Sequence, residues 1–177
     1  RLGRDRETLA ASQALSDLCL RLTADNDPIP GLFTTVILHL ERLESSDLSR
    51  DEVLASTVQA CVHLLTLGGY SLPLQSCCLT GVPLQPPLGQ WHWRCSLLPA
   101  DGFCSGRQSG SVLMLNASEL ALLQRLLRPQ LPRKRDGELM GPERVWLHLQ
   151  ELLQIWCREH LGRSPKALTL LRQDWPA

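Results

Sequence analysis

The sequence predicts a mainly α-helical fold, a helical domain of about five helices with a small inserted β-loop module. Before residue 73 and after residue 115, apolar residues recur at helical spacing, whereas between these positions they do not. Residues 73–115 instead hold four of the seven cysteines and many prolines and glycines, which is typical of short strands and loops. We therefore expect one domain over residues 1–177, helical in 1–72 and 116–177, with the module between them.

Three amphipathic helices are expected in the N-terminal part. The first spans residues 7–23 and the second spans residues 31–43. Their apolar stripes are Leu9, Leu15, Leu18, Cys19 and Leu22, and Leu32, Phe33, Val36, Ile37, Leu40 and Leu43. Ser49 followed by Glu52 is a capping-box pattern that predicts the start of a third helix, and Gly68-Gly69 predicts its end.

Two further helices are expected after the module. Asn116 and Glu119 form a second capping-box pattern ahead of a helix at residues 120–127. The last helix is expected to run from about residue 142 to residue 161, where Gly162 supplies the glycine that helix C-termini prefer.

The module resembles a zinc ribbon, in which two Cys-x-x-Cys-Gly knuckles bind one ion through four thiolates. Here each knuckle keeps only its first cysteine, because Thr80 follows Cys77 and Arg107 follows Cys104 at the ligand positions. A hydroxyl is a poor zinc ligand and a guanidinium has no lone pair to donate. We therefore expect the module to keep its shape without zinc or another cofactor. The alternative metal set consists of Cys77, Cys78, Cys95, Cys104 and His92.

The alternation Trp91-His92-Trp93 is typical of a short strand. Without a metal, the module needs an apolar core of its own. The side chains expected inside it are Trp91, Trp93, Leu97 and Phe103. The alternative for the two tryptophans is stacking on nucleic-acid bases.

Composition argues against several classes of protein. Eighteen basic residues balance eighteen acidic ones, so any anion binding must be local. The chain has no glycine-rich phosphate loop and no metalloprotease or hydrolase motif, which predicts a protein that is not an enzyme. No apolar run reaches the roughly 20 residues that span a bilayer, so we expect a cytoplasmic protein without membrane contact.

The remaining cysteines and histidines have ordinary structural explanations. Cys19, Cys61 and Cys157 fall on apolar helix faces, where thiols pack as small hydrophobic groups. The helical histidines are expected at the surface or at the edge of the core, and they are His39, His63 and His148.

Two cationic clusters are the candidate binding residues. The first is Arg133-Lys134-Arg135 in the loop of residues 128–137, and the second is Arg158, Arg163 and Lys166 near the end of the last helix. One interpretation is that each cluster is only a solvated group of charges, and positive charge at a helix C-terminus also interacts favourably with the helix dipole. The alternative is that each cluster is a local binding site for phosphates or an acidic peptide.

Three stretches together resemble the C-terminal region of the RecO family of bacterial DNA-repair and recombination mediators. The first is the helix at residues 9–18. The second is Leu-Leu-Thr-Leu-Gly-Gly-Tyr at residues 64–70, followed by Leu74 and Cys77. The third is Glu-His-Leu-Gly-Arg at residues 159–163, followed by Lys166.

This resemblance implies an N-terminal OB-fold upstream, binding of single- and double-stranded DNA, and a place at the bacterial nucleoid. It also implies partnership with RecR and with the single-stranded-DNA-binding protein (SSB) in loading the RecA recombinase. The acidic, apolar-tipped tail of SSB needs cations and an apolar groove, for which Arg163 and Lys166 with Leu161 and Leu168 are candidates. The alternative function is a helical protein-interaction or regulatory domain that binds no nucleic acid.

Overall fold

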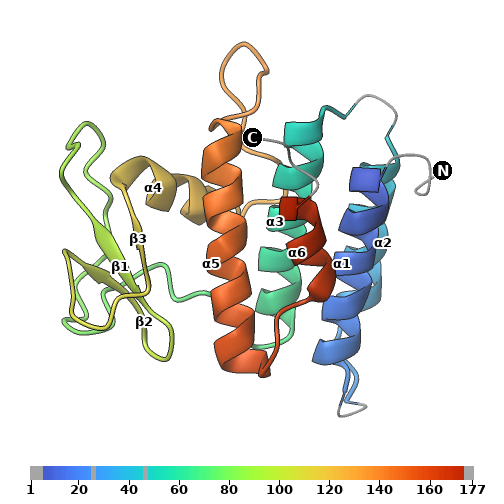
Figure 1. The fold of residues 1–177 in the computed structure, drawn as a ribbon, viewed down its shortest axis with the longest axis horizontal. Helices are drawn as coiled ribbons and strands as arrows, with labels where there is room; N and C mark the ends of the chain where they lie inside the picture. The colour runs from blue at the N-terminus through green and yellow to red at the C-terminus, as the bar shows by residue number, and fades with distance from the viewer. Residues whose placement is uncertain (1–5, 25–26, 46–47, 174–177) are drawn as a thin grey trace.

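A computed structural model describes residues 6–24, 27–45 and 48–173 and confirms the mainly α-helical fold with a small β insert (Figure 1). Six helices and three strands occur among these residues. The helices are α1 (Arg6–Leu22), α2 (Leu32–Glu44), α3 (Arg50–Leu67), α4 (Ala117–Arg125), α5 (Glu143–Leu161) and α6 (Lys166–Gln173). The strands are β1 (Cys95–Leu98), β2 (Gly102–Ser105) and β3 (Leu113–Leu115).

Helix α3 lies at the centre of the helical part and packs against α1, α2 and α5. Twelve of its residues are buried, including all ten from Val53 to Val62, because neighbouring helices cover it on several sides. The predicted capping box is present, with Ser49 Oγ accepting from Glu52 N–H and Glu52 accepting from Ser49 N–H. A buried helix needs this cap because its first N–H groups have no partner within the helix.

The apolar stripes expected on α1 and α2 are only partly correct. Leu9 is 42% exposed and Phe33 is 78% exposed. On α1 the buried face is built largely on Ala10, Ala11 and Ala14, whose small side chains allow close helix packing. Helical spacing alone does not show which side of a broad apolar stripe meets the core.

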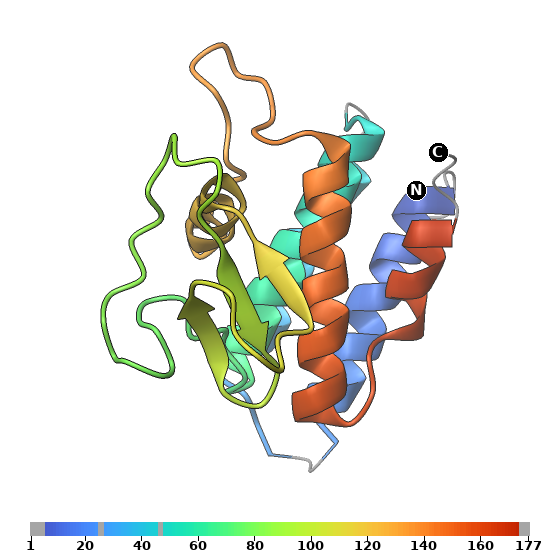
Figure 2. The same cartoon turned by 60° about the vertical axis from the view of Figure 1, so that its left-hand side comes forward.

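The inserted module holds an antiparallel sheet in the order β2-β1-β3. Figures 1 and 2 show the sheet and α4 on one side of α5, with α1, α2 and α6 on the other. The strand predicted at Trp91-His92-Trp93 is wrong, because β1 begins at Cys95 and residues 91–94 form a turn and its exit.

The expected module core is correct for two of its four side chains. Leu97 and Phe103 are fully buried, and Trp93 is half-buried against the core. Trp91 is 85% exposed, so its placement inside the module was wrong. Its backbone is held instead, since Arg94 Nη1 donates to the Trp91 carbonyl over 2.7 Å.

Both capping predictions for the C-terminal helices are confirmed, and a sixth helix was missed. Asn116 and Glu119 cap α4, and Gly162 adopts the left-handed conformation (φ 75°) after α5. Helix α6 has eight residues, and its first backbone N–H, that of Lys166, donates to Asp17 Oδ2 of α1 over 3.0 Å. That cap comes from a residue far away in the sequence. Local signals for the helix exist in Ser164-Pro165 before it and in the helical spacing of Ala167, Leu168 and Leu171.

Among the helices in the described part of the chain, none is both long and apolar enough to cross a membrane.

Candidate nucleic-acid and partner interface

The segment that follows α4 is bound to α2 and α3 through its backbone carbonyls. Gln59 Nε2, from the buried face of α3, donates to the carbonyls of Arg128 (2.8 Å) and Gln130 (3.0 Å). Arg42 Nη1 donates to Gln59 Oε1 over 2.6 Å, and Arg42 Nη2 donates to the Pro129 carbonyl over 2.9 Å. Because three consecutive carbonyls are held in this way, the conformation of the segment is fixed by the helices beneath it.

Two histidines continue the same network. His63 Nε2 lies 2.8 Å from the Leu126 carbonyl and 3.1 Å from the Arg128 carbonyl. Carbonyls only accept, so His63 Nε2 carries the proton, and its Nδ1 accepts from His39 Nε2 over 3.0 Å. Burial, followed by the nearby His63 and Arg42 charges, lowers the pKa of His39 to about 4. Both rings are therefore neutral at pH 7, and His63 donates a hydrogen bond to the backbone of the segment after α4.

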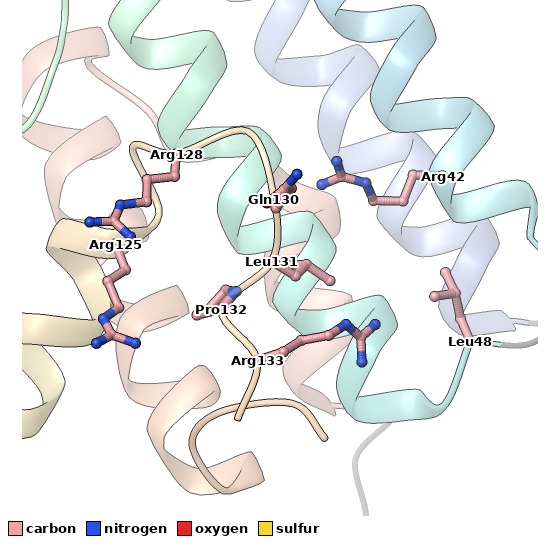
Figure 3. Close-up of a pocket in the computed structure, with 8 residues that line it drawn as sticks. All are labelled: Arg42, Leu48, Arg125, Arg128, Gln130, Leu131, Pro132 and Arg133. Atoms are coloured by element: carbon pink, nitrogen blue, oxygen red, sulfur yellow. The ribbon is translucent and has the colours of Figure 1, made fainter. Parts of the chain in front are cut away.

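An arginine-rich cleft of about 560 Å³ lies beside this fixed segment (Figure 3). Figure 3 shows Arg125 and Arg128 at one side of the cleft and Arg42 at the other, with Arg133 near its lower end. Among the described residues, no carboxylate pairs with Arg42, Arg125 or Arg128. Four guanidinium groups therefore line one concave surface, one of them (Arg133) paired with Glu52, and guanidinium groups are good partners for charged oxygens.

The predicted loop triplet is exposed, but its charges are partly neutralised. Arg133 donates to Glu52 Oε1 over 2.5 Å, and Lys134 pairs with Glu138 over 2.7 Å. Residues 132–140 fold into a small hairpin, in which Arg135 is exposed. Of the three predicted residues, only Arg133 lines the cleft.

Sequence reasoning missed Arg42, Arg125 and Arg128. Arg42 lies on α2 and reaches the cleft only because α2 packs beside α3. Arg125 and Arg128 stand three residues apart, at the end of α4 and just beyond it. That spacing could have indicated a shared surface, but it does not reveal the partner from α2.

The second predicted cluster lies at the opposite end of α5. Arg158 and Arg163 are exposed at its C-terminal end, whereas the cleft is lined by the segment of residues 128–133, which leads toward its N-terminal end. The helix has 19 residues and is therefore about 28 Å long. Lys166 opens α6, so its charge lies at the wrong end of that helix for a favourable dipole interaction. Leu168 is fully buried, and the groove wall expected there was wrong.

The degenerate knuckles retain the turns of the expected module. Gly81 N–H donates to the Cys77 carbonyl (2.8 Å), and Gly81 and Gly106 both have positive φ (72° and 85°). Cys77 and Cys104 are buried with their sulfur atoms 3.0 Å apart, while Thr80 and Arg107 are exposed.

These residues do not fit zinc. Two thiolates on a tetrahedral zinc ion stand about 3.8 Å apart, given Zn–S bonds of about 2.3 Å, and the other two positions supply a hydroxyl and a guanidinium. No group of three or more potential ligands from His, Cys, Asp and Glu is assembled within the described ranges, including the alternative set with His92.

A second concave surface, the Trp91 groove, lies between the module and the start of α5. Its volume is about 410 Å³, and its apolar lining includes Leu88, Trp91, Met140 and Val145. Arg125, Lys134 and Arg144 also line it, so Arg125 is shared with the arginine-rich cleft. Exposed apolar side chains bordered by cations are typical of a protein-binding surface.

Comparison with known proteins gives consistent similarities. The family model described as "Recombination protein O C terminal" matches residues 3–169. "DNA repair protein RecO" of Synechococcus sp. (strain CC9605) is 62% identical over 172 residues, covering 97% of this chain and 66% of that relative. The protein of the same name from Prochlorococcus marinus (strain MIT 9303) is 57% identical over 176 residues, with the same two coverages.

A more distant relative shows the same pattern. "DNA repair protein RecO" of Synechococcus elongatus (strain ATCC 33912 / PCC 7942 / FACHB-805) is 32% identical over 179 residues, covering 96% of this chain and 65% of the relative. The chain thus spans about two thirds of the length of the curated relatives it matches. No solved structure matches it.

Proposed function

The chain belongs to the RecO family, and on this premise we propose that it is the helical part of a non-catalytic mediator of DNA repair and homologous recombination. In this proposal a longer protein carries an OB-fold upstream and works in the bacterial cytoplasm. It binds single- and double-stranded DNA, RecR and SSB, and helps to load RecA. The names of the relatives and the matched family model support the repair role.

We assign the DNA contact to the arginine-rich cleft. The observation that carries this assignment is the convergence of Arg42, Arg125, Arg128 and Arg133 on one surface. Phosphate contacts need cations and fixed geometry but no base recognition. The carbonyl network from α2 and α3 provides the fixed geometry, so little ordering cost remains for the backbone when DNA binds.

A salt titration of binding to a single-stranded oligonucleotide tests the assignment. Affinity should fall steeply with salt, and Arg128→Ala should weaken binding and reduce the slope of log Kd against log salt by about 0.7, which corresponds to one lost phosphate contact. Arg107→Ala, an exposed arginine of the module, is the matched control and should leave the slope unchanged. Absence of salt-dependent binding would instead support the alternative, a domain that binds only protein.

We assign the acidic tail of SSB to the Trp91 groove. Such a tail needs an apolar surface for its tip and cations for its carboxylates. The groove offers Trp91 and Leu88, which are 85% and 67% exposed, beside Arg125 and Arg144. At the other end of α5, Leu168 is buried. It is therefore not available as an apolar groove wall beside Arg158, Arg163 and Lys166.

Calorimetry with a tail peptide separates the two locations. Arg144→Ala should weaken peptide binding and leave DNA binding unchanged, and Arg128→Ala should do the reverse. Arg125→Ala should weaken both, because this residue lines both surfaces. If charge reversal at Arg163 and Lys166 weakens peptide binding while Arg144→Ala does not, the tail site belongs to the far end of α5.

A further inference from the structure

Cys77 and Cys104 form a pair of thiols that the DNA-repair role does not use. Their sulfur atoms are 3.0 Å apart, and the two residues are only 3% and 2% exposed. They are the first cysteines of the two knuckles, whose second ligand positions hold Thr80 and Arg107. The donor set does not fit zinc, and the two thiols are within hydrogen-bond distance of each other.

Backbone hydrogen bonds hold the two cysteines in place. Cys77 N–H donates to the Val82 carbonyl, and the adjacent Cys78 N–H donates to the Phe103 carbonyl, each over 2.8 Å. Cys104 lies in β2 opposite Ser96 of β1. The first knuckle is therefore joined directly to the strand that carries the second cysteine, and this arrangement holds the two sulfur atoms 3.0 Å apart.

We propose that Cys77 and Cys104 form a reversible disulfide that closes the module where a four-cysteine knuckle pair would bind a metal. The oxidant is a peroxide, which is small enough to reach a nearly buried sulfur. Cys77 thiolate attacks one peroxide oxygen, giving a sulfenic acid and releasing hydroxide in the case of hydrogen peroxide. The Cys104 thiol then attacks the sulfenic sulfur and displaces water. In total, two thiols and one hydrogen peroxide give one disulfide and two waters.

The disulfide has a consequence for the Trp91 groove. Leu88 and Trp91 lie in the segment between the two cysteines, so the bond closes a loop that contains them. Closing such a loop restricts the unfolded chain and stabilises the folded module. A dithiol reductant reverses the bond and returns the module to its more easily unfolded form.

The test oxidises the 177-residue chain with hydrogen peroxide and then alkylates the remaining thiols. We expect the intact mass before alkylation to fall by about 2 Da, which is the loss of two hydrogens. Peptide mapping should show a Cys77–Cys104 crosslink that dithiothreitol removes. The thermal midpoint of the oxidised chain should exceed that of the reduced chain by roughly 5–10 °C.

Variants and controls define what overturns the proposal. Cys104→Ser should abolish the mass change and the thermal shift, whereas Cys78→Ser, at the half-buried neighbouring thiol, should retain both. A crosslink between any other pair, or irreversible sulfinic acid at Cys77, overturns the proposal. The peptide map of the unmodified sequence decides the question even if Cys104→Ser does not fold. The result is independent of DNA and peptide binding, so it tests neither of those assignments.

Discussion

At the scale of single residues, His39 and His63 show how burial sets protonation. His39 is only 1% exposed, and within the described residues its Nδ1 has no hydrogen-bond partner. Protonation would place a charge in this buried position beside His63 and Arg42, which is why the pKa of His39 is lowered to about 4. The pKa of His63 is also lowered, mainly by burial. Both rings are therefore neutral in the folded protein at pH 7.

This protonation predicts a pH-dependent stability. The unfolded chain protonates His39 with a pKa near 6.5, so stability is fully present above that pH and is lost as pH falls toward 4. Between pH 7.5 and pH 5 we expect a loss of roughly 2 kcal/mol from His39. Over this range the carboxylates with lowered pKa, Glu52 and Glu119, stay ionised.

Urea unfolding at the two pH values measures the effect. His39→Gln keeps a donor toward His63 but does not titrate, so its stability should change much less with pH. The exposed His92 provides the matched control, since His92→Gln should keep the pH dependence of the original chain. Equal pH dependence in all three proteins would contradict a buried neutral His39.

Trp91 should matter for binding and not for stability. Because its side chain is 85% exposed, Trp91→Ala should change the free energy of unfolding by less than about 0.5 kcal/mol. It should weaken binding of the acidic tail peptide about tenfold, which corresponds to about 1.4 kcal/mol. Trp93→Ala, at the half-buried neighbour, should lower the free energy of unfolding and leave the affinity for the peptide largely unchanged. A loss of DNA binding without a loss of peptide binding would instead indicate base stacking on Trp91.

At the scale of elements, α4 is tied at its start to α5. Glu119 accepts from Asn116 N–H over 2.9 Å through one oxygen, and its other oxygen lies 3.1 Å from His148 Nδ1 of α5. The hydrogen bond and charge of His148 lower the pKa of Glu119, although burial opposes this shift. A residue predicted as a capping partner therefore also fixes α4 against α5.

Removing the cap should destabilise the protein moderately. Asn116→Ala removes the acceptor for Glu119 N–H and should cost about 1 kcal/mol in the free energy of unfolding. Ser118→Ala, at an exposed position in the first turn of the same helix, is the matched control and should be near neutral. Chemical denaturation gives both values, and a larger loss for Ser118→Ala would contradict the capping role.

The module is joined to α5 by an apolar contact between two aromatic side chains. Phe103 of β2 stacks against Trp156 of α5 with ring centroids 6.5 Å apart. Trp156 Nε1 in turn donates to the Tyr70 carbonyl over 2.8 Å. Since Phe103 is fully buried, Phe103→Ala should cost about 3–5 kcal/mol. Amide exchange should increase most in β1, β2 and β3, while a uniform increase across α1 would show that the module and helices unfold together.

At the scale of the whole molecule, the arginine-rich cleft depends on buried side chains of α3. Gln59→Ala would remove the side-chain donor to the Gln130 carbonyl and leave the Arg128 carbonyl with His63 Nε2 as its side-chain donor. Losing hydrogen bonds at this part-buried site should cost about 1–3 kcal/mol in total, and we also expect weaker DNA binding. Gln90→Ala, at an exposed glutamine of the module, is the control for both measurements. Normal DNA affinity in a folded Gln59→Ala protein would show that the network does not position the arginines.

The helical class, the inserted module and the ends of several elements follow from local sequence. Ser49 and Asn116 cap their helices by hydrogen bonds to a residue three positions later, and Gly162 ends α5 because glycine readily adopts a positive φ. Both kinds of cap depend only on residues that are close in the sequence. The prediction that the knuckles bind no zinc rests on residue type alone, because ligand chemistry is a property of each side chain, and it stays a prediction.

Contacts between residues that are distant in the sequence became clear only from the three-dimensional fold. The α6 cap depends on Asp17 of α1, and the cleft depends on Arg42 of α2 reaching a segment more than eighty residues later. Trp91 was expected inside the module and is exposed, since a side chain's burial depends on what packs over it. These features arise from contacts between distant segments, whose geometry no local periodicity or spacing encodes.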